Sequence, residues 1–315
     1  MQSGGGQVGI SFFRSLSGRS SRFAKSRLVA GAFLISFSGV WVKVCHVTPT
    51  VSAFYRVLFG GVFLLVAALI KREVQQLHWR HMMLMLLCGL LFAVDLICYH
   101  YSIHYIGPGL GTILPNFQVF LLALIGAMLL KEKVRLIAVI SMPIAFAGLF
   151  LIVGIDWTGL DHHYKIGICI GLSAAVFYAL FLLTLRKLQS EQVGKSIFYI
   201  LMMVSLTTAA LIALELLRTG DSFAIPDWQS FWSLLALGLF SQAIGWILIT
   251  NALPHVRASL SGLILLLQPA LAFIWDVLLF QRRTGMLNWI GVTITLAAIY
   301  MGTTGGLRAK VMRKK

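Results

Sequence analysis

The chain has 315 residues, of which 59% are hydrophobic and only 11% charged, and its formal net charge is +16. So little polar surface excludes a globular domain that faces water on all sides. A charge of +16 could indicate a nucleic-acid-binding protein, but the basic residues stand in short clusters between apolar runs. That pattern is typical of membrane topology.

The first 27 residues are rich in Gly and Ser, basic and free of acids. They contain no short apolar core followed by a cleavage site, so we do not interpret them as a secretory signal. We expect a disordered cytoplasmic tail, with an organelle-targeting segment as the alternative. The four cysteines have irregular spacing and no CxxC, and we predict small buried side chains rather than disulfides or metal ligands.

Ten predominantly apolar runs follow this tail. Each is close to the roughly 20 residues that a helix needs to cross a hydrocarbon core about 30 Å thick. Lipid offers no partner to an unpaired backbone group, so such runs must be helical. We therefore predict an all-α integral membrane protein with ten transmembrane helices. The runs cover residues 28–44, 51–70, 82–103, 110–130, 136–155, 166–185, 197–217, 231–253, 260–280 and 287–303.

The Lys and Arg residues between these runs predict the orientation. With the N-terminus inside the cell, twenty of the 26 fall in cytoplasmic segments and five in outer segments, and Arg56 lies within a span. Cytoplasmic loops carry the excess of positive charge in membrane proteins. We expect both termini in the cytoplasm and the protein in the inner membrane of a bacterium.

Five spans in each half predict two repeats inserted with opposite orientation. The first repeat is expected at 28–155 and the second at 166–303, with basic cytoplasmic tails at 1–27 and 304–315. Few residues are identical between the halves, so the helix count and loop pattern carry this prediction. Inverted repeats indicate a binding site near the bilayer midplane and alternating access.

Asp95 is the main candidate for the chemistry, because an acid in the middle of a span costs a few kcal/mol and should face the bundle interior. Helical spacing places Tyr99 and Ser102 on its face. Asp95 could contact an amine of a substrate or exchange a proton. Alternatively, it is hydrogen-bonded to a neighbouring helix or held neutral.

Lys43 and Arg56 lie near the outer end of their spans and could either reach the interface or provide fixed cations inside the bundle. His100 and His104 have the i, i+4 spacing of metal ligands, but no third ligand is evident nearby. We favour an interfacial position for both. For Asp276 we expect pairing with Arg282 or Arg283, or contact with water.

Aromatic and amide side chains complete the candidate site. In span eight, Gln242 and Trp246 are i, i+4 neighbours, and Trp246 lies too deep for an interfacial anchor. The alternative for the mid-depth amides is hydrogen bonding between helices, worth under ~1 kcal/mol each. The full predicted substrate-binding set is Trp41, Lys43, Arg56, Asp95, Tyr99, Asn116, Gln118, Tyr178, Gln242, Trp246 and Gln268.

Several segments resemble the EamA family of the drug/metabolite transporter superfamily. FSGVWVKVCHVTPTVSAFYRVLFGGVFLLVAAL is similar to the start of its first repeat, with Lys43, Pro49 and Arg56 at the matching positions. ALIGAMLLKEKVRLIAVISMPIAFAGLFLIV resembles the end of that repeat, with Glu132 at the glutamate position. IGICIGLSAAVFYALFLLTLRK and LLLQPALAFIWDVLLFQRRTGMLNWIGVTITLAAIYM resemble the opening and close of the second repeat. Its usual glutamate is replaced by Gln281, Arg282 and Arg283.

The resemblance implies ten helices, cytoplasmic termini and a central cavity formed mainly by spans one, three, four, six, eight and nine. It also implies transport of amino acids or other small metabolites, often outward. We therefore predict a secondary transporter of a small polar metabolite, an amino acid or related compound, exported by alternating access. The alternatives are a passive channel or facilitator and a translocator of lipids or of nucleotide or sugar conjugates.

No enzyme motif, cofactor or metal site is expected, since no Walker loop, GxSxG or HExxH is present. The expected partners are a small-molecule substrate and membrane lipid, with no nucleic acid. Coupling to a proton or another ion, and the choice between monomer and homodimer, stay open at this stage.

Overall fold

The computed structural model describes residues 23–70, 79–118, 120–122, 124–125, 136–153, 160–191, 197–252, 255–256 and 264–305. Within these ranges the regular elements are all helical, and no strand is present. In the described part of the chain, six helices are long and apolar enough to cross a membrane: Phe23–Val44, Pro49–Ile70, Trp79–Ile106, His162–Leu185, Phe198–Thr219 and Trp228–Ala252. Shorter apolar helices cover Val139–Ile152, Leu267–Phe280 and Met286–Gly302. The all-helical class is thus confirmed, and the ten-helix inverted repeat stays a prediction.

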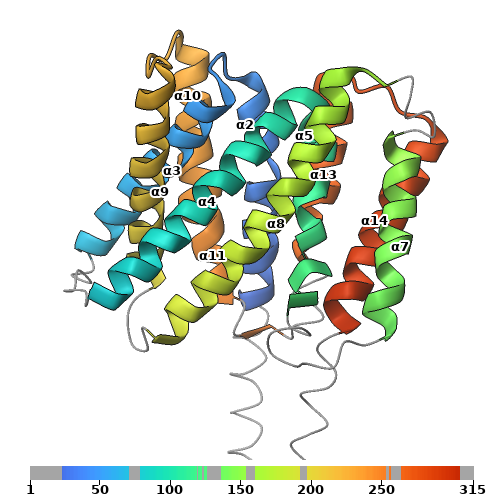
Figure 1. Ribbon diagram of the computed structural model, residues 1–315, viewed down its shortest axis with the longest axis horizontal. Coiled ribbons are helices and arrows are strands. Elements are labelled where there is room, and N and C mark those ends of the chain that lie inside the picture. Colours follow the sequence, from blue (N-terminus) through green and yellow to red (C-terminus); the bar gives the residue numbers. More distant parts are fainter. Residues whose placement is uncertain are drawn as a thin grey trace, which may run out of the picture.

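The helices follow the predicted order along the chain (Figure 1). The part before residue 155 contains α2 (Ser38–Val44), α3 (Pro49–Ile70), α4 (Trp79–Ile106), α5 (Pro108–Ile113), the 3₁₀ turn η1 (Leu114–Phe117) and α7 (Leu136–Val153). The later part contains α8 (His162–Glu191), α9 (Ile197–Thr219), α10 (Trp228–Ala236), the π-helical stretch η2 (Leu237–Gly245), α11 (Trp246–Ala252), α13 (Leu267–Phe280) and α14 (Met286–Gly305).

Helices from the first part of the chain pack mainly on helices from the second. α3 packs on α9 and η2, α4 on α8, α5 on α13, and α7 on α14. In Figure 1 the α7–α14 pair stands at one end of the bundle, and α3, α9 and α10 stand at the other. The middle of the bundle is therefore lined from both parts of the chain.

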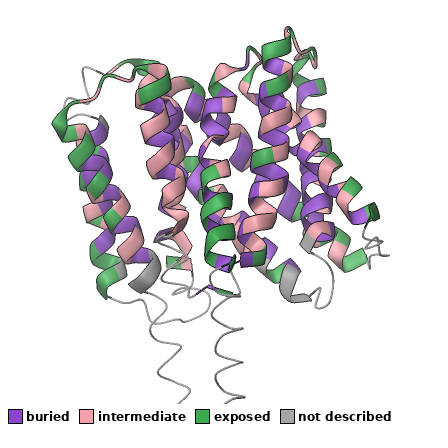
Figure 2. Ribbon diagram, turned by 180° about the vertical axis from the view of Figure 1, so that it is seen from behind, coloured by how far each residue is buried: buried purple, intermediate pink, exposed green. Residues whose placement is uncertain are grey.

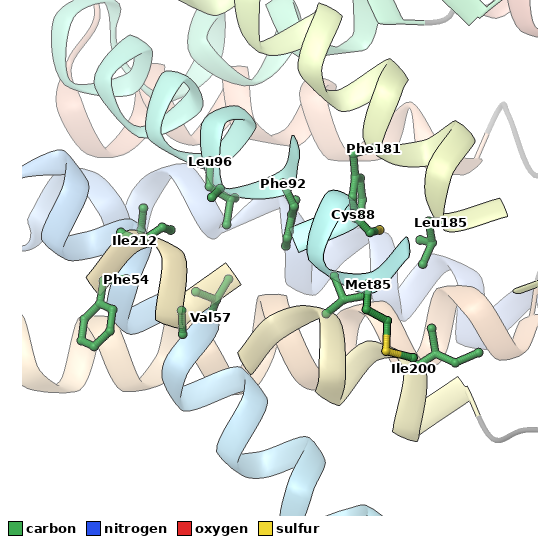
Figure 3. Packing of buried hydrophobic residues seen from close by; sticks show 14 of the residues in the cluster. Phe54, Val57, Met85, Cys88, Phe92, Leu96, Phe181, Leu185, Ile200 and Ile212 are labelled. Atoms are coloured by element: carbon green, nitrogen blue, oxygen red, sulfur yellow. The ribbon is translucent and has the colours of Figure 1, made fainter. Parts of the chain in front are cut away.

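Buried apolar side chains hold α3, α4, α8 and α9 together. Phe92 of α4 and Phe181 of α8 stack with their ring centroids 4.4 Å apart and their planes at 16°. Figure 3 shows this pair beside Met85, Cys88 and Leu185. Such tight packing fixes the helices on which the polar residues at mid-depth stand.

The outer faces of the helices are apolar as well. Figure 2 shows buried positions turned toward the bundle centre and exposed ones on its outside. The exposed residues include large apolar ones such as Phe150 and Leu214. Apolar exposure on this scale marks a surface that meets another apolar phase, here lipid.

Two of the predicted continuous helices are interrupted. The segment predicted at 110–130 begins as α5 and changes to the 3₁₀ turn η1 at Leu114, next to Pro115, and residues 126–130 lie outside the described part. Proline cannot donate the backbone hydrogen bond of a regular helix, which explains this change. The span predicted at 231–253 contains the π-helical η2 between α10 and α11. Long π-helical stretches are rare and occur frequently at functional sites.

Candidate substrate-binding site

Arg56 is a fixed cation inside the bundle. It stands on α3, and only 5% of the residue is exposed. Its Nε donates a hydrogen bond to Oε1 of Gln242 over 3.2 Å, and its guanidinium carbon lies 5.7 Å from the ring centroid of Tyr99. Its Nη1 is buried without a hydrogen-bond partner. Of the two positions that the sequence left open, the structure places Arg56 inside the bundle and not at the interface.

Asp95 lies on α4 opposite this cation. It is also 5% exposed and lies within electrostatic range of Arg56. Among the described residues, however, its carboxylate has no hydrogen bond, and no ion pair with Arg56 forms within 4.0 Å. A buried charge without a direct partner is expensive in a membrane and indicates a functional site. The acid and the base thus lie within electrostatic range of each other without a direct contact.

The π-helical stretch η2 holds the amide that orients Arg56. Oε1 of Gln242 accepts from Arg56, while its Nε2 donates to Oγ of Ser205 on α9 over 3.1 Å. The close approach of α3 and η2 depends on Gly60, because a Cβ there would collide with the side chain of Gln242. The position of the cation is therefore set by three helices together.

Aromatic side chains surround the charged pair. The hydroxyl of Tyr99 lies 3.2 Å from Oγ1 of Thr112. Tyr178 stacks on Phe181 at 6.0 Å, and Trp246 meets the same ring edge-on at 6.4 Å and 86°.

Two indole groups of this cluster have no partner. Trp41 packs against the apolar cluster that includes Tyr99. The Nε1 atoms of Trp41 and Trp246 are both buried without a hydrogen bond. A buried indole N–H usually finds an acceptor, so these two unpartnered donors are candidates for contact with a ligand.

Four predicted residues lie outside this arrangement of contacts. Lys43 is exposed, and its Nζ donates to the backbone carbonyl of His104 over 3.3 Å. Asn116 uses its amide within its own segment, donating to the carbonyl of Thr112. Gln118 is half-buried, with Oε1 unpartnered. Gln268 is also half-buried, in the first turn of α13.

The structure corrects the interfacial position expected for His100. His104 is exposed, but His100 is fully buried, and its Nδ1 lies 2.6 Å from Oγ of Ser52 on α3. Ser102 points to α8, where it donates to the carbonyl of Gly167, so it does not share the site of Asp95. Helical spacing alone could not predict the directions in which these two side chains point, because α4 has apolar residues on every face.

Sequence reasoning missed two residues that support the site, Ser205 and Thr112. Both are small polar residues in apolar spans, and each contacts a predicted residue. Many Ser and Thr residues in these spans instead bond the carbonyl three or four positions earlier, as Thr184 does. The sequence pattern does not distinguish a Ser or Thr that contacts another residue of the site from one that bonds a carbonyl of its own helix.

The predicted pairing of Asp276 is confirmed. Its Oδ2 lies 3.0 Å from Nη1 of Arg282 and accepts a hydrogen bond from the backbone N–H of Gly109. Arg282 also donates to the carbonyl of Ile106 and to the hydroxyl of Tyr164. This network connects α13 to α4, α5 and α8. Within it, the charges of Asp276 and Arg282 balance each other.

Comparison with known proteins agrees with this architecture. The profile of the EamA-like transporter family matches residues 26–154 and again residues 165–304. The chain belongs to the EamA-like transporter family. The resemblance seen in the sequence is confirmed, and the protein is a multi-pass membrane transporter.

Relatives of this EamA-like transporter include the pseudopaline exporter CntI of Pseudomonas aeruginosa, 25% identical over 237 residues that make up 74% of this chain and 78% of CntI. A transporter of Clostridium kluyveri is 23% identical over 82% of this chain and 84% of its own length. The transporter YvbV of Bacillus subtilis is 23% identical over 87% and 90%. One crystal structure shares the fold, with a TM-score of 0.60 and 18% identity over 94% of this chain and 99% of that one.

Proposed function

We propose that this EamA-like transporter is a secondary transporter that exports a small zwitterionic metabolite, an amino acid or a related compound, across the inner membrane. The observation that supports this most is that Arg56 and Asp95, a base and an acid, are both buried and do not touch. A solute with a carboxylate and an ammonium group would satisfy both.

The chemistry of Arg56 and Asp95 indicates which end of the solute each of them would bind. A guanidinium forms paired hydrogen bonds with a carboxylate, and Nη1 of Arg56 is unpartnered. Asp95 would accept from the ammonium group. Tyr99, Tyr178 and Trp246 would contact the apolar part, and Gln242 would keep the guanidinium in place.

The positions of these residues support alternating access. Arg56 and Asp95 come from α3 and α4, whereas Gln242 and Trp246 come from η2 and α11. A relative motion of the two parts of the chain would therefore open or close the site, as in transporters built from repeats. Export is supported by the relative CntI, which is a pseudopaline exporter.

The test is a stabilisation screen on the purified protein, since a ligand that binds only the folded state raises the melting temperature. We expect amino acids to stabilise it, and their methyl esters and N-acetyl derivatives to do so far less. Hydrogen bonds to charged groups contribute about 1.5–3 kcal/mol, so Asp95→Asn and Arg56→Gln should each weaken binding about 10- to 100-fold. The exposed pair Asp161→Asn and Arg283→Gln serves as the control.

The two variants should also differ in what they still recognise. Asp95→Asn should lose its discrimination against N-acetyl derivatives, and Arg56→Gln its discrimination against methyl esters. Stabilisation by sugars or lipids alone would contradict the proposal. Transport in vesicles that never saturates and shows no counterflow would indicate a channel or facilitator instead.

A further inference from the structure

A second, basic groove lies at the end of the bundle where α4 begins and α8 ends. Its volume is about 730 Å³, and its walls come from the first turns of α4, including Arg80, and from Lys187 of α8. Arg80 precedes Asp95 by fifteen residues, which corresponds to about 22 Å along a helix. The groove is therefore separate from the central site and lies near a membrane surface.

One part of this groove is positively charged. Arg80 and Lys187 are both exposed and come from two different helices. Among the described residues that line the groove, none is acidic. An anion is the complementary ligand.

The other part of the groove is apolar. Met83 and Leu87, one and two turns further along α4, are 42% and 46% exposed. Trp79, which is 64% exposed, lies at the start of the helix, where tryptophan is enriched at the level of lipid headgroups. A ligand that fits the whole groove carries an anionic group and an apolar chain on the same molecule.

We propose that this groove binds an anionic phospholipid of the cytoplasmic leaflet, with its phosphate at Arg80 and Lys187 and an acyl chain along Met83 and Leu87. Basic pockets between transmembrane helices on the cytoplasmic side bind such headgroups. The site is independent of the solute that the transporter carries.

Native mass spectrometry of the purified full-length protein tests this proposal. The protein is equilibrated with micelles that contain phosphatidylglycerol or phosphatidylcholine of the same acyl composition, and the retained lipid is counted. Each cation near a surface contributes about fivefold to the affinity for an anionic lipid, so Arg80→Gln with Lys187→Gln should weaken retention of phosphatidylglycerol about 25-fold. Retention of phosphatidylcholine should not change.

Arg283→Gln is the matched control, because it removes an exposed arginine at the opposite end of the bundle. It should keep the preference for phosphatidylglycerol, and a melting scan shows whether each variant is folded.

Leu87→Ser should weaken retention of both lipids. Equal retention of the two lipids by the unaltered protein would overturn the proposal, as would a preference that survives the double substitution. Displacement of phosphatidylglycerol by inorganic phosphate alone would also overturn it, because the site would then bind a free anion.

Discussion

Asp95 and Asp276 are both buried acids, but the protein uses them differently. Asp276 has an arginine at 3.0 Å and a backbone N–H as partners, so its charge is balanced inside the protein. Asp95 has a cation only at longer range and no direct partner in the described part of the chain. Because an unpaired charge in a membrane is destabilising, Asp95 is the one that we expect a ligand to satisfy.

At the same scale, Arg282→Gln should destabilise the protein. It would leave Asp276, whose side chain is 4% exposed, without its partner, and removing one member of a buried pair costs about 3–5 kcal/mol. The measurement is the free energy of unfolding in mixed micelles. Arg283→Gln, one residue further along and exposed, should change it by less than about 0.5 kcal/mol. Equal effects of the two substitutions would contradict a structural role for the Asp276 network.

Among the elements, η2 both packs closely on α3 and carries Gln242, which holds Arg56 in the candidate binding site. Its π-helical backbone carries Gln242 toward Arg56, and α3 can approach it because position 60 has no side chain. A Cβ at Gly238 of η2 would lie 2.6 Å from Cβ of Phe59, so the contact is tight from both sides. The orientation of the cation thus depends on the distance between two helices.

Gly60→Ala should therefore affect both stability and binding. Overpacking of a close contact costs about 1–3 kcal/mol, and the added methyl group would push Gln242 away from Arg56. We expect a lower melting temperature and weaker stabilisation by an amino acid. Gly285→Ala is the control, because its nearest neighbour would be 3.8 Å away. If Gly60→Ala lowered stability and left ligand affinity unchanged, the contact between α3 and η2 would not affect ligand binding through Gln242.

A second contact joins the segment just after α2 to the start of α10. Asp227 caps α10 by accepting from the backbone N–H of Ser230 over 2.8 Å, and it lies 2.9 Å from Nδ1 of His46. These two donors lower the pKa of Asp227 below its ordinary value of 3.8. The charged form is thus favoured in the folded protein.

Because the folded pKa is lowered, the stabilisation by Asp227 is fully present above pH 3.8 and is lost as the pH falls through the folded value. We expect Asp227→Ala to lower the melting temperature by a constant amount near neutral pH and by a shrinking amount below that value. Asp227→Asn should retain most of the stability, since asparagine is also a good N-cap. A difference that grew on acidification would contradict this assignment.

At the scale of the whole molecule, packing of the two parts of the chain against each other places the site between them. The charged pair comes from the first part, and Gln242 and Trp246 come from the second. The predicted orientation of this bundle rests on its Lys and Arg distribution.

Cysteine labelling tests that orientation. In a variant without the four native cysteines, Ser222→Cys in the loop before α10 should react with a membrane-impermeant maleimide in intact cells. Lys187→Cys at the end of α8 should react only after the cells are opened. The reverse pattern would overturn the predicted topology and, with it, the leaflet assigned to the lipid groove.

Much of the site could be predicted from single residues, because charged and large polar side chains stand out in an apolar sequence. Arg56, Asp95, Tyr99, Gln242 and Trp246 were predicted in this way. Arg56 contacts Tyr99 and Gln242 and lies within electrostatic range of Asp95, whereas Trp246 packs against Phe181. The direction of a side chain was harder to predict. Ser102 and His100 are on the same helix as Asp95, yet they contact α8 and α3.

The sequence by itself determined the helical class, the positions of most spans and the family, because the length and apolarity of a segment decide whether it can cross a bilayer. Only the tertiary structure decided that Arg56 is buried and held by Gln242, that His100 faces Ser52, and that η2 departs from a regular α-helix. An apolar run has apolar residues on every face of its helix, so the sequence does not show which face packs against another helix. Which face meets another helix is therefore settled by packing between segments more than a hundred residues apart.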